Sequence, residues 1–100
     1  MLNLSNFNTS NVIYMDFMFN DCKSLLSINL SNFDTSNVES IYYLFNNDKY
    51  LMHIDISSFD EHLNYYYSFE GIHYSGIIHA NKNIVLKIID ALPSGWIINF

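Results

Sequence analysis

Cysteine, positive charge and long apolar stretches are all scarce in this chain of 100 residues. Its single cysteine, Cys22, excludes an intrachain disulfide, so nothing internal points to an oxidising compartment. Only four lysine and arginine residues stand against ten aspartate and glutamate residues, for a formal net charge of −6. No basic stripe is present to neutralise phosphates, which argues against nucleic acids and anionic membrane surfaces as partners.

The sequence also lacks the signatures of a membrane span, an export signal and common catalytic sites. Its most apolar stretch, Ile84 to Ile98, is interrupted by Lys87 and Asp90, so no membrane insertion is expected. No basic segment followed by an apolar one opens the chain, which predicts either a cytoplasmic protein or a piece of a longer exported one. There is no phosphate-binding loop, nucleophile elbow or CxxC motif, so neither enzymatic activity nor a cofactor is expected.

What the sequence does have is an internal repeat. The segment Leu4–Val12 returns almost letter for letter as Leu30–Val38, and a weaker third copy begins at Ile56, at the same offset. A fixed period of this size, about 26 residues, is typical of a solenoid, in which each unit buries its apolar face by stacking on its neighbours. The chain is interpreted as one domain with repeats at about 2–27, 28–53 and 54–77 and a degenerate capping region at 78–100.

Each repeat contains two patterns of apolar residues. A short apolar-polar-apolar alternation predicts strands at 2–4, 28–30 and 54–56. Steps of three and four then predict helices over 12–19, 38–45 and 63–69. The fold class expected is α/β, a right-handed repeat solenoid in which short parallel strands alternate with short helices.

The C-terminal region departs from the repeat, as terminal units do when they close a core. It predicts a strand at 78–80, a helix capped by Asn83 that continues to Leu92, and a last strand at 96–100. Trp96 is placed to plug this end. The first strand has no such cap, and its open edge predicts either a place within a longer array or a homo-oligomer formed through open ends.

The repeat motif resembles that of the BspA-like leucine-rich-repeat surface proteins. Residues 2 to 25 carry Leu-x-Leu-Ser-Asn-Phe-Asn-Thr-Ser-Asn-Val, then Met15, Met18-Phe19, Cys22 and Ser24-Leu25 at the family's spacing. The resemblance is good over residues 28 to 51, weak over 54 to 69, and ends there. It implies an α/β solenoid, a cell-surface or secreted location, and adhesion or partner binding without catalytic residues.

Several aromatic residues fall on positions of the predicted helices that face away from the core. If Val12, Val38 and Leu63 point inward, six rings point outward or sideways: Tyr14, Phe17, Tyr42, Tyr43, Tyr65 and Tyr67. Tyrosine offers a large contact area at little entropy cost, so a contiguous patch of this kind suits a protein or glycan partner. The alternative is that several of these rings pack laterally between adjacent helices.

The outward positions of the predicted strands form a second, polar candidate surface. Stacking places Asn3, Asn29, Asp55 and His79 in one column and His53 in the next. A His/Asp metal site or an acid–base pair is one interpretation. An ordinary surface pair on a polar sheet is the other, and it is favoured because metal motifs have tight local spacing and these residues do not.

Cys22 is the remaining residue with potential chemistry. A nucleophilic thiol needs a histidine base and an electropositive setting, and no histidine precedes His53. Cys22 is therefore interpreted as a buried spacer. The sequence as a whole predicts a non-enzymatic interaction or adhesion module. The alternatives are a structural C-terminal cap of a longer array and a small metal-binding protein.

Overall fold

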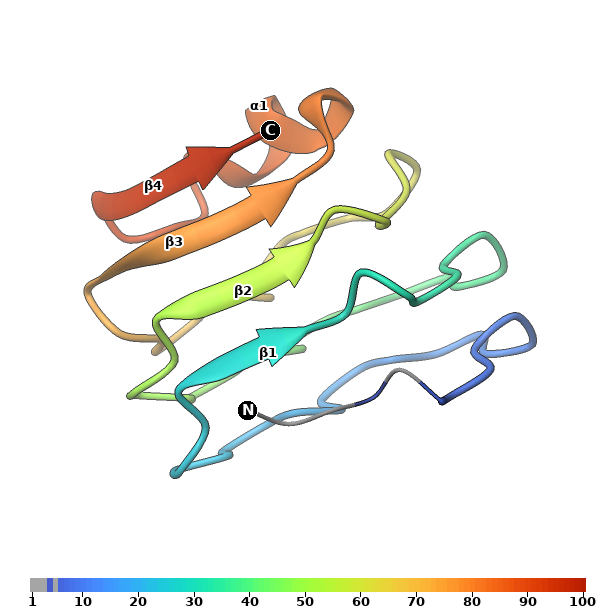
Figure 1. The fold of residues 1–100 in the computed structure, drawn as a ribbon, viewed down its shortest axis with the longest axis horizontal. Coiled ribbons are helices and arrows are strands. Elements are labelled where there is room, and N and C mark those ends of the chain that lie inside the picture. The colour runs from blue at the N-terminus through green and yellow to red at the C-terminus, as the bar shows by residue number, and fades with distance from the viewer. Residues whose placement is uncertain (1–3, 5) are drawn as a thin grey trace.

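The chain forms a solenoid of about three turns built on one parallel β-sheet. The computed structural model describes Leu4 and residues 6–100. Its sheet has the order β1-β2-β3-β4, with strands β1 (Ser27–Asn29), β2 (His53–Ile56), β3 (Ser75–Ala80) and β4 (Gly95–Asn99). In Figure 1 the strands run to the right in front, and the chain returns behind them and climbs one level per circuit, which makes the coil right-handed.

The strand register confirms the predicted stacking of the repeats. Ile28 pairs with Ile54, Ile54 with Ile78, and Ile78 with Ile98, so the offset between successive strands falls from 26 to 24 and then to 20 residues. The predicted strands in the second, third, fourth and last positions are therefore present. The first predicted strand, at 2–4, falls largely outside the described residues.

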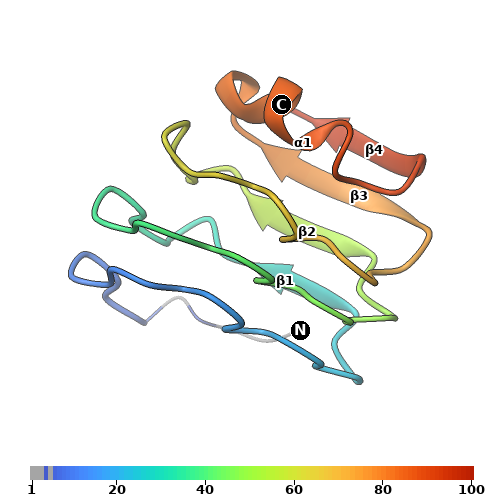
Figure 2. The same cartoon turned by 180° about the vertical axis from the view of Figure 1, so that it is seen from behind.

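The helices predicted over 12–19, 38–45 and 63–69 require correction, because these segments are extended chain followed by tight turns. Their backbone groups bond to the next turn of the solenoid: the N–H of Met15 donates to the carbonyl of Ser40 at 3.0 Å, and that of Phe45 to Ser68 at 2.9 Å. Figure 2 shows these return segments running side by side. Hydrogen bonds between turns thus replace the bonds that a helix would make within itself.

Helical structure is confined, among the described residues, to the last turn. A 3₁₀ turn, η1 (Lys82–Ile84), leads directly into α1 (Val85–Ile88), in the region where a helix was predicted. The side chain that caps it is Asn81 rather than Asn83, since Asn81 accepts a hydrogen bond from the Asn83 N–H. No helix in the described part of the chain is long and apolar enough to cross a membrane.

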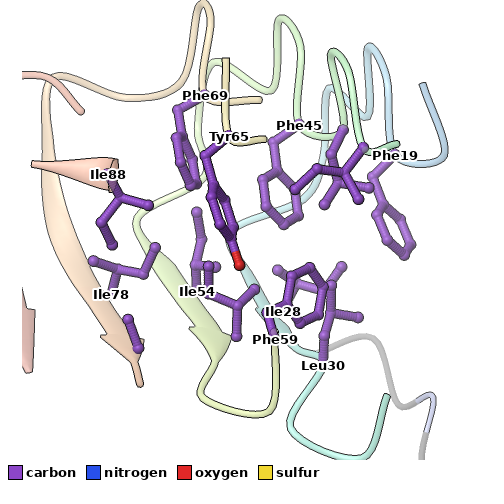
Figure 3. Packing of buried hydrophobic residues seen from close by; sticks show 14 of the residues in the cluster. Phe19, Ile28, Leu30, Phe45, Ile54, Phe59, Tyr65, Phe69, Ile78 and Ile88 are labelled. Atoms are coloured by element: carbon purple, nitrogen blue, oxygen red, sulfur yellow. The ribbon is translucent and has the colours of Figure 1, made fainter. Parts of the chain in front are cut away.

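The core is a stack of equivalent apolar residues between the sheet and the return segments. Ile28, Ile54 and Ile78 form one fully buried column beneath the sheet (Figure 3). Opposite them, Phe19, Phe45 and Phe69 stack with ring centroids 6.0 and 5.9 Å apart, and we call these three the inner ring column. Because each ring is covered by its neighbour, burial depends on the stack and not on any single repeat.

Trp96 closes the C-terminal end of the core, as predicted, by lying against a glycine. Its ring is buried and its Nε1–H donates to the carbonyl of His73 at 2.7 Å. Trp96 pairs with Gly76 on β3, and a Cβ added to Gly76 would lie 2.7 Å from the indole and closer still to the carbonyl of Met52. Only glycine fits between these two groups.

We expect Gly76→Ala to lower the free energy of unfolding by about 1–3 kcal/mol, because backbone and indole must both move to admit the methyl group. Urea unfolding followed by Trp96 fluorescence measures this loss. Ser75→Ala, one residue away, serves as the control and should change stability much less. Equal unfolding midpoints for Gly76→Ala and the wild type would contradict the close contact.

Candidate interaction surface

An exposed row of aromatic rings runs along the return side of the solenoid. Phe17, Tyr43 and Tyr67 stand at equivalent places in three successive turns, and their rings stack with centroids 5.0 and 5.3 Å apart and planes inclined by 13° and 12°. We call these three residues the aromatic ladder. It lies on the solvent side of the inner ring column. Its first and last rings, Phe17 and Tyr67, are 53% and 54% exposed.

Tight turns in the backbone place these rings. Phe17, Tyr43 and Tyr67 have φ values of 59°, 56° and 59°, in the left-handed region that bulky residues seldom occupy. Four residues later Asp21, Asn47 and Gly71 are also left-handed, and these are residue types that tolerate it. The repeated conformation turns each ladder ring away from the core while the ring two positions later points inward.

Polar side chains hold the turns that carry the aromatic ladder in register. Asp16 accepts hydrogen bonds from the backbone N–H of Tyr42 and the hydroxyl of Ser40, both at 2.7 Å. The Asn46 amide donates to the Asn20 side chain at 2.8 Å. These bonds span 24 to 26 residues, so each one joins neighbouring turns. Side-chain hydrogen bonds between turns therefore hold the backbone in place both before and after the ladder residues.

The six aromatic residues predicted to face outward do not all do so. Tyr14 and Tyr42 are exposed on the return segments that carry the ladder, and a hydrogen bond with the Glu39 carboxylate raises the pKa of the Tyr14 phenol. Tyr65 is a correction: it is only 2% exposed, and its hydroxyl donates to the carbonyl of Asp60 at 2.9 Å. Burial raises the pKa of the Tyr65 hydroxyl above its usual range.

Tyr66 is a second correction, because helical spacing placed it with Leu63 and Phe69 on the inward face, whereas it is exposed and lies next to the ladder. Its ring centroid is 6.3 Å from that of Tyr67, with the planes inclined by 49°. The third turn is two residues shorter than the first two, and this contraction moves Tyr65 to the buried place of Ile41 and Tyr66 to the exposed place of Tyr42. The shorter spacing between Ile54 and Ile78 was the available signal.

The described residues of the polar strand face have the predicted register. Asn29 pairs with Asp55 and Asp55 with His79, while His53 pairs with Ser27 and Ile77. Asp55 accepts hydrogen bonds from the N–H and hydroxyl of Ser57 at 3.0 and 2.7 Å, which stabilise the turn after β2. In the part of the chain that the structure describes, no three His, Cys, Asp or Glu residues are grouped to hold a metal ion. Asn3 lies outside the described residues.

Cys22 lies against a buried carboxyl group, in a setting opposite to that of a nucleophile. Its N–H donates to Oδ1 of Asp48 at 2.6 Å, and burial together with Asp48 and Asp21 raises the pKa of the thiol. A thiol in such surroundings stays protonated and unreactive. Its partly buried position agrees with the spacer interpretation.

Asp48 is the strongly perturbed acid of the described chain. It is fully buried, and its Oδ2 has no hydrogen-bond partner among the described residues. Burial raises the pKa of Asp48 to about 7, against the opposing effect of the Cys22 N–H and with a contribution from Asp21. Ionisation of this carboxyl group therefore costs folding free energy.

We expect Asp48 to make the protein less stable as the pH rises. A folded-state pKa above the unfolded value gives stability that is present below pH 4 and lost as the pH passes 7, at up to about 1.4 kcal/mol per pH unit. Asp48→Asn keeps the acceptor for Cys22 and removes the charge, so urea unfolding at pH 5 and pH 8 should differ less in this variant than in the wild type.

Asp34→Asn is the control for the Asp48 experiment. Hydrogen bonds from Ser36 lower the pKa of Asp34, so this carboxylate is ionised at both pH 5 and pH 8. Its removal should leave the difference between the two pH values as in the wild type. An unchanged difference in Asp48→Asn would show that another group carries the pH dependence.

The fold and this surface define a class, a parallel β-solenoid with an aromatic face on its return side. The family model described as "Mycoplasma protein of unknown function, DUF285" matches residues 2–74. The chain belongs to that family. No curated protein and no solved structure matched the chain significantly.

Proposed function

We propose that this domain is a non-enzymatic binding module that holds a protein or glycan partner against the aromatic ladder and the tyrosines beside it. One observation supports this above the others: three stacked rings lie outside a core that the inner ring column already fills. Exposing a contiguous row of aromatic rings to water is unfavourable in free energy, and covering the row with a partner removes this cost, so such a row suits a docking surface. Tyr14, Tyr42 and Tyr66 widen the row.

We further propose that partner binding serves adhesion at a cell surface, the role that the resemblance to BspA-like leucine-rich-repeat proteins implies. The constant offset between the first repeats and the column of parallel strands support that resemblance. In this proposal the domain is a leucine-rich-repeat-like solenoid in which tight turns replace the helices of the first units and only η1 and α1 remain helical.

We expect the double change Tyr42→Ala and Tyr43→Ala to reduce partner capture at least tenfold, because it removes an exposed ring and the middle of the aromatic ladder. Immobilised wild-type and variant domains are exposed to cell-surface extracts and to a glycan array, and what each retains is quantified. Circular dichroism checks that the variant is folded, and Tyr42→Ser alone is a milder version that leaves the ladder intact.

The double change His53→Ala and His79→Ala is the matched control, since it removes two exposed rings from the strand side instead. It should retain the partners that the wild type retains. Loss of partners in the histidine variant alone would move the binding site to the polar strand face. Retention of every partner by the tyrosine variants would refute binding through the aromatic ladder.

A structural role is the second candidate function, and the N-terminal end of the stack supports it. A largely apolar hollow of about 500 Å³ opens there, and Val12, Met18, Phe19 and Phe33 are among the residues that line it. In the second turn the carbonyls of Ser40 and Tyr42 accept hydrogen bonds from the turn before. The equivalent carbonyls of the first turn face no described turn. This end would suit another unit of the same repeat, from a longer array or from a second copy.

We expect the molar mass of the domain, measured by light scattering, to rise with concentration if two copies meet through this end. Met18→Glu should prevent the rise, since it places a charge on the apolar hollow. Met52→Glu is the control, because Met52 lies outside the hollow and has almost the same exposure, 42% against 43% for Met18. A constant monomer mass would rule out association between copies.

A further inference from the structure

A groove of about 680 Å³ separates the third turn from the helical segment at the C-terminal end. Tyr66, Tyr67 and Glu70 line it from the third turn, and Leu86 and Asp90 line it from the other side. The groove exists because the last turn is the shortest, and η1 and α1 take the place of the extended return segment and tight turn of the earlier units. Figure 2 shows α1 next to the third return segment.

The aromatic ladder ends at this groove with one ring face uncovered. Tyr67 stacks on Tyr43 with one face, at a centroid distance of 5.3 Å, so its other face is directed toward the C-terminal side of the stack. No aromatic residue of the last turn lines the groove to continue the ladder. The Tyr66 ring, which also lines the groove, is inclined by 49° to that of Tyr67. The groove is therefore shaped to accept a flat group against Tyr67.

The charged groups of the groove favour a cation. Glu70 and Asp90 are exposed carboxylates on opposite walls. Lys87 also lines the groove, and its ammonium group is engaged by the carbonyl of Glu61, to which it donates a hydrogen bond. The whole chain carries a net charge of −6, which attracts positively charged partners. A guanidinium group is both flat and cationic, stacks on aromatic faces and bonds to carboxylates through two parallel N–H groups.

We propose that this groove binds an arginine side chain of a partner protein, with the guanidinium group against the open face of Tyr67 and its N–H groups donating to Glu70 and Asp90. The inference rests on the proposed binding function and specifies the chemistry of the partner at one end of the aromatic ladder. This chain contains no arginine, so a second copy of it does not supply the ligand.

The first test uses three short capped peptides, Gly-X-Gly, in which X is arginine, lysine or citrulline. Each is titrated into the ¹⁵N-labelled domain, and amide shifts are followed by NMR. Citrulline is flat without a charge, and lysine is charged without a flat group. We expect the arginine peptide to bind about fivefold more tightly than either of the others, with the largest shifts at Tyr67, Glu70 and Asp90.

The second test compares Tyr67→Asn with Phe17→Asn. Each change removes one terminal ring of the aromatic ladder at a left-handed residue of φ 59°, a conformation that asparagine tolerates. Only Tyr67 lies at the groove, so Tyr67→Asn should weaken the arginine peptide about fivefold and Phe17→Asn should leave its affinity unchanged. Glu70→Gln and Asp90→Asn should weaken binding without disturbing the stack, and should also reduce its dependence on salt.

Absence of a saturable shift at the groove, equal affinity for the citrulline peptide, or equal loss in Phe17→Asn would overturn the assignment. Failure of this inference differs from failure of the proposed function. If Tyr42→Ala and Tyr43→Ala lose their partners while Tyr67→Asn, Glu70→Gln and Asp90→Asn keep them, the binding module stands and the arginine site falls. If the arginine peptide binds as expected while the tyrosine variants keep every partner, the groove binds arginine, but the proposed binding through the aromatic ladder is refuted.

Discussion

Every turn of this solenoid depends on backbone hydrogen bonds that run to the next turn. The N–H groups of Met15, Phe17 and Phe19 donate to carbonyls of the second turn, and β1 to β4 pair in the same direction on the opposite side. Buried backbone groups must be paired, so an isolated turn has no stable conformation. The stacked rings, the side-chain bonds across turns and the aromatic ladder all follow from this common register.

The sheet could be predicted from the sequence, and the return segments could not. Apolar-polar-apolar triplets, at offsets of 26 and then 24 residues, placed Ile28, Ile54 and Ile78 correctly in one column. The steps of three in Val38, Ile41 and Leu44 were interpreted as helical. The step from Ile41 to Leu44 arises instead from a tight turn, since the N–H of Leu44 bonds to the carbonyl of Ile41 three residues before it, whereas Val38 to Ile41 is extended chain. Extended chain followed by such a turn buries the same residues as one helix face, so periodicity alone does not separate the two.

The candidate surface was predictable only where the repeat is regular. Tyr43 and Phe17 lie in units of equal length, and their shared outward position followed from the constant offset between those units. The third unit is two residues shorter, and nothing in its sequence marks where the chain contracts. Tyr65, expected to be exposed, is therefore buried, and Tyr66, expected to be buried, is exposed. The groove beside Tyr67 depends on the shorter last turn, which has no repeat to align with.

Hydrogen bonds between turns lie roughly along the axis of the coil, and this has a mechanical consequence. Tension between the first and last turns loads the layers of hydrogen bonds one after another, so they break sequentially instead of being sheared together. Each layer that gives way releases 20 to 26 residues, or roughly 65 to 90 Å of extended chain. A tether of this design would lengthen in steps and absorb a sudden load, while the turns still stacked keep their surface intact.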